Sequence, residues 1–121
     1  GGEPALQVDR ALIDALRTAG YRLAIETNGT IALPAGFDWI TVSPKGPEAA
    51  LRQRAADEVK YVRGAGQPLP ETTVAAAHKL LSPAFRGGEL DRDALAWCIE
   101  LVRRHPEWRL SVQQHKGWQI R

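Results

Sequence analysis

Gly1-Gly2-Glu3-Pro4 opens the sequence and, more than any other stretch, indicates the fold. Two glycines allow positive φ angles and let the backbone come close to a ligand, and a proline sets the φ angle with which a helix begins. Such a run normally follows a strand and leads into a helix. No strand precedes it here, so we expect the sequence to start within a motif, as the C-terminal portion of something longer.

Patterns typical of helices and strands alternate downstream. Helices are expected over residues 8–19, 48–56, 71–78 and 92–104, and strands over residues 21–25, 39–42, 58–62, 79–81 and 108–112. Gly20 suits the C-cap of the first helix and Asp91 the N-cap of the last, whose apolar stripe would hold Leu95, Cys98, Ile99 and Val102. The alternation predicts an α/β fold with a parallel sheet and right-handed crossovers.

Polar clusters follow the predicted strands at the point where each strand ends. They are residues 26–30, 43–45, 82–83 and 113–116. In parallel α/β sheets, ligands bind at the edge formed by the carboxyl ends of the strands. The pattern therefore predicts a ligand site at that edge, although polar turns after strands are also common in proteins without one.

Composition limits the classes of function. The 121 residues are 44% hydrophobic and 25% charged, as in one globular unit, and the net charge of +2 is too small to indicate nucleic acid as a partner. A single cysteine, Cys98, excludes a disulfide framework or a set of cysteine metal ligands within the chain. No apolar run approaches the roughly 20 residues of a membrane-spanning helix, so we expect a cytoplasmic protein.

Five elements, taken together, resemble the radical S-adenosylmethionine enzymes, and among them the 7-carboxy-7-deazaguanine synthase family. They are Gly-Gly-Glu-Pro at 1–4, Glu-Thr-Asn-Gly-Thr at 26–30, Asp-Trp-Ile-Thr-Val-Ser-Pro-Lys at 38–45, Asp-Glu-Val-Lys at 57–60 and Trp-Arg-Leu-Ser-Val-Gln-Gln-His-Lys at 108–116. The resemblance implies that residues 1–121 are the C-terminal part of one radical S-adenosylmethionine domain. The fold would be a partial (β/α) barrel whose N-terminal, cluster-binding part is missing.

The resemblance also implies an activity. Enzymes of this family, carbon–nitrogen lyases of queuosine and 7-deazapurine biosynthesis, rearrange 6-carboxy-5,6,7,8-tetrahydropterin into 7-carboxy-7-deazaguanine with loss of ammonia. They use S-adenosylmethionine, a four-iron, four-sulfur cluster and Mg²⁺, with an external electron donor such as flavodoxin. The full-length protein is expected to be a cytoplasmic homodimer that binds neither nucleic acid nor membrane. The ligands of the cluster and of Mg²⁺ would precede Gly1, so the chain alone is expected to be inactive.

Site residues are carried over by position. Those implied to bind the cofactor are Gly1, Gly2, Glu26, Ser43, Pro44, Lys45, Ser82 and Pro83, and those implied to bind the substrate are His115 and Arg121, the latter through the terminal carboxylate. The family segment Gln-Pro-Met-Asp stands here as Ser82-Pro83-Ala84-Phe85, so only its proline is kept. Gln114 and Gly117-Trp118 also depart from the family pattern beside His115.

Each of these residues also has a purely structural interpretation. The two glycines suit an ordinary turn, and Lys45 suits a solvated position. Glu26 suits a turn in which its carboxylate accepts hydrogen bonds from the backbone of Thr27 and Asn28. The four tryptophans, at positions 39, 97, 108 and 118, are expected mainly in the core, as is the Cys98 thiol. His78 and His105 are expected as surface or capping residues.

Two other functions remain open from the sequence. One is a different small radical S-adenosylmethionine enzyme, such as an activase of glycyl-radical enzymes, which needs neither His115 nor a terminal carboxylate. The other is a non-catalytic α/β ligand-binding or interaction module, in which the glycines serve only as turns and S-adenosylmethionine does not bind.

Overall fold

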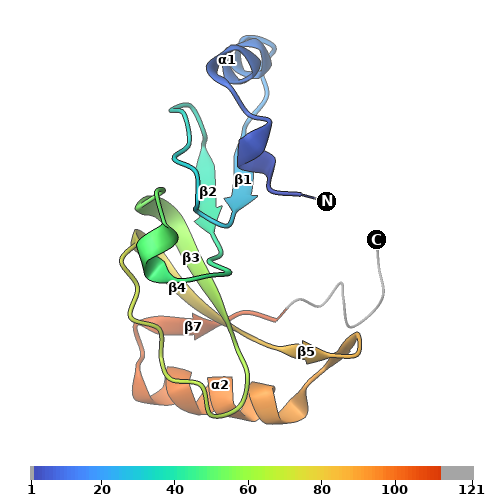
Figure 1. The fold of residues 1–121 in the computed structure, drawn as a ribbon, viewed down its shortest axis with the longest axis vertical. Coiled ribbons are helices and arrows are strands. Elements are labelled where there is room, and N and C mark those ends of the chain that lie inside the picture. Colours follow the sequence, from blue (N-terminus) through green and yellow to red (C-terminus); the bar gives the residue numbers. More distant parts are fainter. Residues whose placement is uncertain (1, 113–121) are drawn as a thin grey trace. The chain divides into compact units, whose positions relative to one another are not determined.

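The structure is a computed structural model that describes residues 2–112. It is an α/β fold whose five-stranded sheet has the strand order β1-β2-β3-β4-β7 (Figure 1). The β1–β2, β2–β3 and β4–β7 pairs run parallel, as the sequence predicts. The chain divides into two compact units, residues 1–59 with 72–77 and residues 60–71 with 78–121.

The first unit contains the N-terminal helices and the first strands. Its elements are the 3₁₀ helices η1 (Pro4–Leu6) and η2 (Glu48–Ala50), the α-helix α1 (Arg10–Thr18), β1 (Ala24–Thr27), β2 (Trp39–Val42) and the start of β3 (Ala55–Arg63). Ile25 pairs with Ile40 and Val42 with Val59, and the side chains of Ile25, Val42 and Val59 are buried. These side chains form the apolar face of the sheet in this unit.

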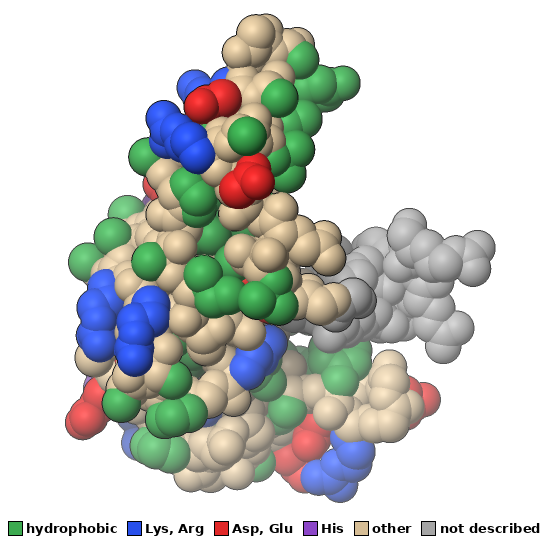
Figure 2. Space-filling view, turned by 45° about the horizontal axis from the view of Figure 1, so that its top comes forward, with side chains coloured by type: hydrophobic (Ala, Val, Ile, Leu, Met, Phe, Trp, Pro, Cys, Tyr) green, Lys and Arg blue, Asp and Glu red, His purple; other side chains and the backbone are tan. Residues whose placement is uncertain are grey.

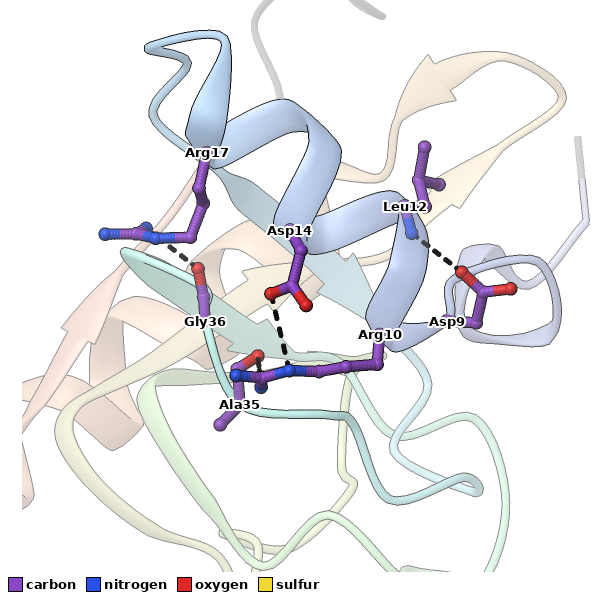
Figure 3. A network of polar contacts seen from close by, with 7 residues as sticks. All are labelled: Asp9, Arg10, Leu12, Asp14, Arg17, Ala35 and Gly36. Carbon is purple, nitrogen blue, oxygen red and sulfur yellow. Dashed lines mark hydrogen bonds and ion pairs between the residues drawn. The ribbon is translucent and has the colours of Figure 1, made fainter.

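Helix α1 is fixed at both ends by polar contacts (Figure 3). The Asp9 carboxylate accepts from Leu12 N at 2.8 Å and so caps the helix. Arg10 donates to Ala35 O at 2.8 Å, and Arg17 donates to Gly36 O at 2.9 Å. These bonds tie the helix to the loop that precedes β2.

Helix α1 is amphipathic, and part of its apolar side is uncovered among the described residues. Ile13 is buried, whereas the Leu12 side chain is 43% exposed. Figure 2 shows hydrophobic side chains along one side of the segment at the top of the view, with acidic and basic side chains on the other. An apolar groove of about 260 Å³ lies between this side of the helix and β1.

The second unit contains the rest of β3 and the C-terminal elements. These are β4 (Ala75–Pro83), a two-stranded hairpin of β5 (Phe85–Arg86) and β6 (Glu89–Leu90), α2 (Arg92–Arg104) and β7 (Trp108–Leu110). Of β4, the part from His78 onward belongs to this unit. Helix α2 packs on β7, and Tyr61 meets Trp108 edge to face at 6.0 Å between ring centroids. None of the helices described in residues 2–112 has the length and apolar character that crossing a membrane requires.

Helix α2 matches its predicted range and cap. Asp91 accepts from Asp93 N and Ala94 N, and His105 is the C-cap residue, so its predicted capping role is confirmed. The predicted apolar stripe is only partly correct, because the buried positions are Ala94, Cys98 and Leu101 and Ile99 is 42% exposed. The buried stripe is therefore rotated toward Leu101 relative to the prediction.

Two predicted helices are wrong. Residues 48–56 form only the single turn η2 before β3 begins, and the alanine-rich residues 71–78 lead into β4 instead of a helix. Alanine favours helix when nothing else acts, but in β4 the pairing with neighbouring strands overrides that preference. Helices and strands therefore do not alternate regularly as predicted.

Several boundaries and exposures also differ from the predictions. Strand β1 begins at Ala24 and includes Glu26 and Thr27, which were predicted to form a turn, and β7 ends at Leu110. Trp39 is 39% exposed instead of buried, because it lies on the polar face of the sheet. His78 is half-buried within β4, away from any helix end, whereas Trp108 and Cys98 are buried as predicted.

Gly29 gives a testable prediction about the turn after β1. Its φ is +82°, and a Cβ there would lie 2.9 Å from Val42 Cγ1 and 3.0 Å from Leu51 Cδ2. Gly29→Ala should lower the free energy of unfolding by about 1–3 kcal/mol, from backbone strain and overpacking together. Urea denaturation of the full-length protein measures this change.

The matched control is Gly66→Ala. Gly66 has nearly the same φ, +83°, but an added Cβ there would meet nothing within 4 Å. Gly66→Ala should therefore lower the free energy of unfolding through backbone strain alone, without overpacking. Equal losses for the two variants would contradict a close contact at Gly29.

Candidate functional site

A hollow of about 310 Å³ lies at the carboxyl ends of β1 and β2. Its lining residues are Gly2, Glu3, Pro4, Glu26, Thr27, Asn28, Ser43 and Lys45. The two strands are parallel and Thr27 pairs with Val42, so the segments that follow them meet at one edge. The structure thus brings together four of the residues predicted for the site, namely Gly2, Glu26, Ser43 and Lys45.

The remaining predicted site residues lie elsewhere. Pro44 is half-buried between Ser43 and Lys45 but does not line the hollow. Ser82 and Pro83 are buried at the end of β4, in the second unit. Gly1, His115 and Arg121 lie outside the described residues.

Glu3 fixes the segment that carries Gly2 to the end of β1. Its Oε1 accepts from Asn28 N at 2.7 Å, and its Oε2 accepts from Thr27 Oγ1 at 2.6 Å and from Ala5 N at 2.8 Å. Glu3 and Asn28 are 25 positions apart, so these bonds join distant parts of the chain. Both carboxylate oxygens accept hydrogen bonds from the protein, and Glu3 therefore shapes the hollow.

The ionised form of Glu3 is favoured. Burial opposes its charge, but the hydrogen bonds from Asn28 N, the Thr27 hydroxyl and Ala5 N outweigh burial and lower the pKa of the carboxyl below its usual 4.5. The carboxylate is therefore charged at neutral pH, with all of its described donors in place.

Thr27 joins three walls of the hollow. Its hydroxyl donates to Glu3 and accepts from Gly29 N at 3.2 Å, and its carbonyl accepts from Ser43 N at 2.8 Å. The residue is only 2% exposed. A shift of Thr27 would consequently move Gly2, the turn after β1 and the segment after β2 together.

Gly2 is exposed and lines the hollow. Apart from its neighbours in the chain, a Cβ built on Gly2 would meet no described atom within 4 Å and would project into open space. The backbone of Gly2 is therefore accessible to a ligand.

Glu26 lies on the polar face of the sheet. Glu26 pairs in register with Thr41 of β2, and Thr41 pairs with Glu58 of β3. On this face Trp39 Nε1 donates to Thr41 Oγ1 at 3.0 Å, and Thr41 Oγ1 donates to Glu58 Oε1, also at 3.0 Å. The structural interpretation of Glu26 as a turn carboxylate is wrong, because Glu26 is in β1 and Asn28 N donates to Glu3. Its exposed carboxylate lines the hollow.

Charges of both signs line the hollow. Lys45 is exposed, and its Nζ lies 3.4 Å from Ser43 Oγ. The lining therefore contains one ammonium, that of Lys45, two carboxylates, those of Glu3 and Glu26, and the exposed backbone of Gly2. This set suits a zwitterionic small molecule with further hydrogen-bonding groups.

No group of three or more His, Cys, Asp or Glu side chains within residues 2–112 is arranged to hold a metal ion. Cys98, the chain's single cysteine, is buried on α2 in the second unit, where its thiol lies 3.7 Å from Arg63 O. Burial raises the pKa of this thiol, which keeps it protonated. It therefore has the character of the core thiol that the sequence predicts.

Comparison with known proteins gives a consistent result. The chain is 47% identical over its whole length to the 7-carboxy-7-deazaguanine synthase of Bradyrhizobium diazoefficiens, covering 57% of that protein. It is 44% identical to the synthase of Nitratidesulfovibrio vulgaris and 43% identical to that of Bacteroides thetaiotaomicron, over 96% and 100% of this chain and 55% and 63% of those proteins. The chain resembles 7-carboxy-7-deazaguanine synthases.

The resemblance predicted from the sequence is thereby confirmed. The chain spans between 55% and 63% of the length of these three synthases. No family profile matches it. Each of these synthases is therefore longer than this chain.

Four residues that line the hollow were not predicted for the site: Glu3, Pro4, Thr27 and Asn28. Glu3, Thr27 and Asn28 lie within the motifs at 1–4 and 26–30, but no contact between these two motifs was predicted. Their bonds join positions 24 and 25 apart, which spacing along the chain does not reveal. The only local signal was that an acidic residue beside two glycines precedes a helix start, where a carboxylate commonly caps free amides.

Glu3→Gln tests the importance of the Glu3 bonds. Glutamine keeps an acceptor for Asn28 N but replaces the oxygen that accepts from Thr27 and Ala5, so the free energy of unfolding at pH 7 should fall by about 1–3 kcal/mol. Because the pKa of Glu3 is lowered on folding, its contribution is full above about pH 4.5 and is lost as the pH falls through the folded value. The difference in the free energy of unfolding between wild type and Glu3→Gln should therefore be smaller at acidic pH than at pH 7.

Urea denaturation of both proteins at pH 7 and pH 3 measures this difference. The control is Glu71→Gln, which removes an exposed carboxylate outside the hollow and should change the free energy of unfolding by no more than about 0.5 kcal/mol at pH 7. A Glu3→Gln variant as stable as wild type at pH 7 would contradict the role assigned to Glu3.

Proposed function

We propose that the protein containing this chain is a 7-carboxy-7-deazaguanine synthase, a lyase that converts 6-carboxy-5,6,7,8-tetrahydropterin into 7-carboxy-7-deazaguanine with loss of ammonia. The single observation that carries the proposal is the 47% identity over all 121 residues to a synthase of this kind. The hollow supports it, because four of the residues expected to bind the cofactor line one site.

The residues of the hollow fit S-adenosylmethionine by their chemistry. That molecule carries an amino group, a carboxylate and ribose hydroxyls, and when bound it supplies the radical chemistry of the enzyme. The accessible Gly2 backbone suits the amino group, and the exposed Lys45 ammonium suits the carboxylate or a hydroxyl. Ser43 is buried beside Lys45 and contributes a hydroxyl.

The other residues implied by the resemblance complete the proposed cofactor site. Gly1 and Pro44 flank Gly2 and Ser43, and Glu26 supplies a carboxylate on the polar face of β1. Ser82 and Pro83 lie at the carboxyl end of another parallel strand, β4. We propose a radical S-adenosylmethionine barrel for the full-length domain, a fold in which ligands bind at the carboxyl ends of the strands.

The four-iron, four-sulfur cluster does not fit the residues of this chain. Such a cluster is held by several cysteine thiolates, whereas the chain contains one cysteine, buried on α2. We propose that the cluster and Mg²⁺ are bound by parts of the longer protein that the sequence does not contain. The cytoplasmic location, the homodimer and an electron donor such as flavodoxin belong to the same proposal.

The pterin substrate is proposed to contact His115 and Arg121. An imidazole can donate to or accept from a heterocycle. A glycyl-radical-enzyme activase would need neither residue. This difference separates the proposed function from that alternative.

Turnover of 6-carboxy-5,6,7,8-tetrahydropterin by the reduced full-length protein tests the proposed function. His115→Ala and, separately, Arg121→Ala should each lower kcat/KM at least tenfold, whereas His105→Ala on the α2 C-cap should not. An active wild type indifferent to both changes would contradict the proposed substrate contacts. No pterin turnover by the wild type would contradict the function itself.

Lys45→Met tests the cofactor site. Loss of the ammonium should weaken binding of S-adenosylmethionine about tenfold, which corresponds to about 1.4 kcal/mol. Isothermal titration calorimetry of the full-length protein measures the dissociation constant. Arg54→Met is the matched control, because it also removes one positive charge from an exposed side chain of the first unit but lies outside the hollow. Equal weakening by both variants would indicate a general effect of net charge.

A further inference from the structure

Asn28 is one of the residues that line the hollow, and the orientation of its side chain is fixed. Its Oδ1 accepts from Thr30 N at 3.0 Å and from Thr30 Oγ1 at 2.7 Å. A backbone N–H can only donate, so the atom of the Asn28 amide that faces it must be the oxygen and the NH₂ group must point elsewhere. The hydrogen-bond network thus determines which side of the amide is available.

The backbone of Asn28 is fixed as well. Its N–H donates to Glu3 Oε1 at 2.7 Å, which ties the residue to the segment carrying Gly2. Thr27, directly before it, is buried and bonded to Glu3, to Gly29 and to Ser43. Asn28 is therefore held at its main chain and at its side-chain oxygen.

The NH₂ group of Asn28 remains available for a ligand. No hydrogen bond from it to another side chain or backbone group occurs among residues 2–112. Asn28 is half-buried and belongs to the lining of the hollow with Gly2 and Lys45. A fixed amide donor in a small-molecule site is the kind of group that gives a ligand its orientation, because it needs no reordering on binding.

We propose that Asn28 donates its side-chain NH₂ to an acceptor atom of the bound cofactor, and that Glu3 and Thr30 hold it in place for that contact. The inference rests on the proposed function, which names S-adenosylmethionine as the molecule bound in the hollow. It adds a binding residue to the site. Asn28 acts as a specificity residue, since a ligand without an acceptor at that point would leave the amide unpaired.

Asn28→Asp in the full-length, cluster-reconstituted protein tests the proposal. Aspartate keeps an oxygen for Thr30 N and Thr30 Oγ1, but it replaces the NH₂ donor by a second acceptor. The dissociation constant for S-adenosylmethionine should rise at least tenfold. Isothermal titration calorimetry without substrate or reductant gives this value independently of turnover.

Gln67→Glu is the matched control. Its Oε1 accepts from Gly64 N at 2.6 Å in a turn, so this change also converts an amide to a carboxylate while keeping the internal acceptor. Gln67 is exposed and does not line the hollow. This variant should bind S-adenosylmethionine within twofold of wild type.

A second variant separates loss of the donor from loss of the fold. In Asn28→Ser the hydroxyl can still accept from Thr30 N in the same kind of turn, but it is too short to replace the amide NH₂. Thermal unfolding midpoints close to wild type for either Asn28 variant, together with tenfold weaker binding, would support the proposal. Dissociation constants within twofold of wild type in a folded Asn28 variant would overturn it.

The experiment also distinguishes failure of the inference from failure of the proposed function. If wild type binds S-adenosylmethionine and both folded Asn28 variants bind it equally well, only the role of Asn28 is overturned. If wild type itself does not bind S-adenosylmethionine, the proposed function fails and the inference fails with it.

Discussion

The carboxylate of Glu3 is the interaction on which the candidate site depends. Its two oxygens accept from Asn28 N, Thr27 Oγ1 and Ala5 N, and they join the segment before η1 to the end of β1. No strand pairing connects that segment to the sheet in the described part of the chain. Without the carboxylate, the Gly2 backbone and the turn after β1 would lose their fixed relation, although each segment could still form by itself.

An ionised carboxylate suits this position because parallel strand ends leave amides without ladder partners. Strand β1 stops at Thr27, so Asn28 N needs an acceptor from outside the sheet, and Glu3 provides a charged one. The hydrogen bonds overcome the effect of burial and lower the pKa of Glu3, so the bonds persist at neutral pH. The same bonds that satisfy the strand end therefore also build one wall of the hollow.

The sequence predicted the features set by local chemistry. Asp91 and the following apolar pattern were sufficient for the bounds of α2, and the strand at 39–42 was predicted at the observed bounds of β2. The sequence did not predict that residues 75–78 join a strand, because alanine has no local preference for one and only pairing within the sheet decides. Motif positions located Gly2, Ser43 and Lys45, but Glu3 and Asn28 act through contacts between distant segments.

Two residues that line the hollow, Gly2 and Asn28, share one support. Glu3 is adjacent to Gly2 in sequence and bonded to Asn28 N, so both residues are positioned by the same side chain before any ligand arrives. Fixing two contacts with one internal carboxylate lowers the conformational entropy that binding would otherwise cost. The Glu3 carboxylate accepts three hydrogen bonds from within the protein, and Lys45 supplies the positive charge among the residues that line the hollow.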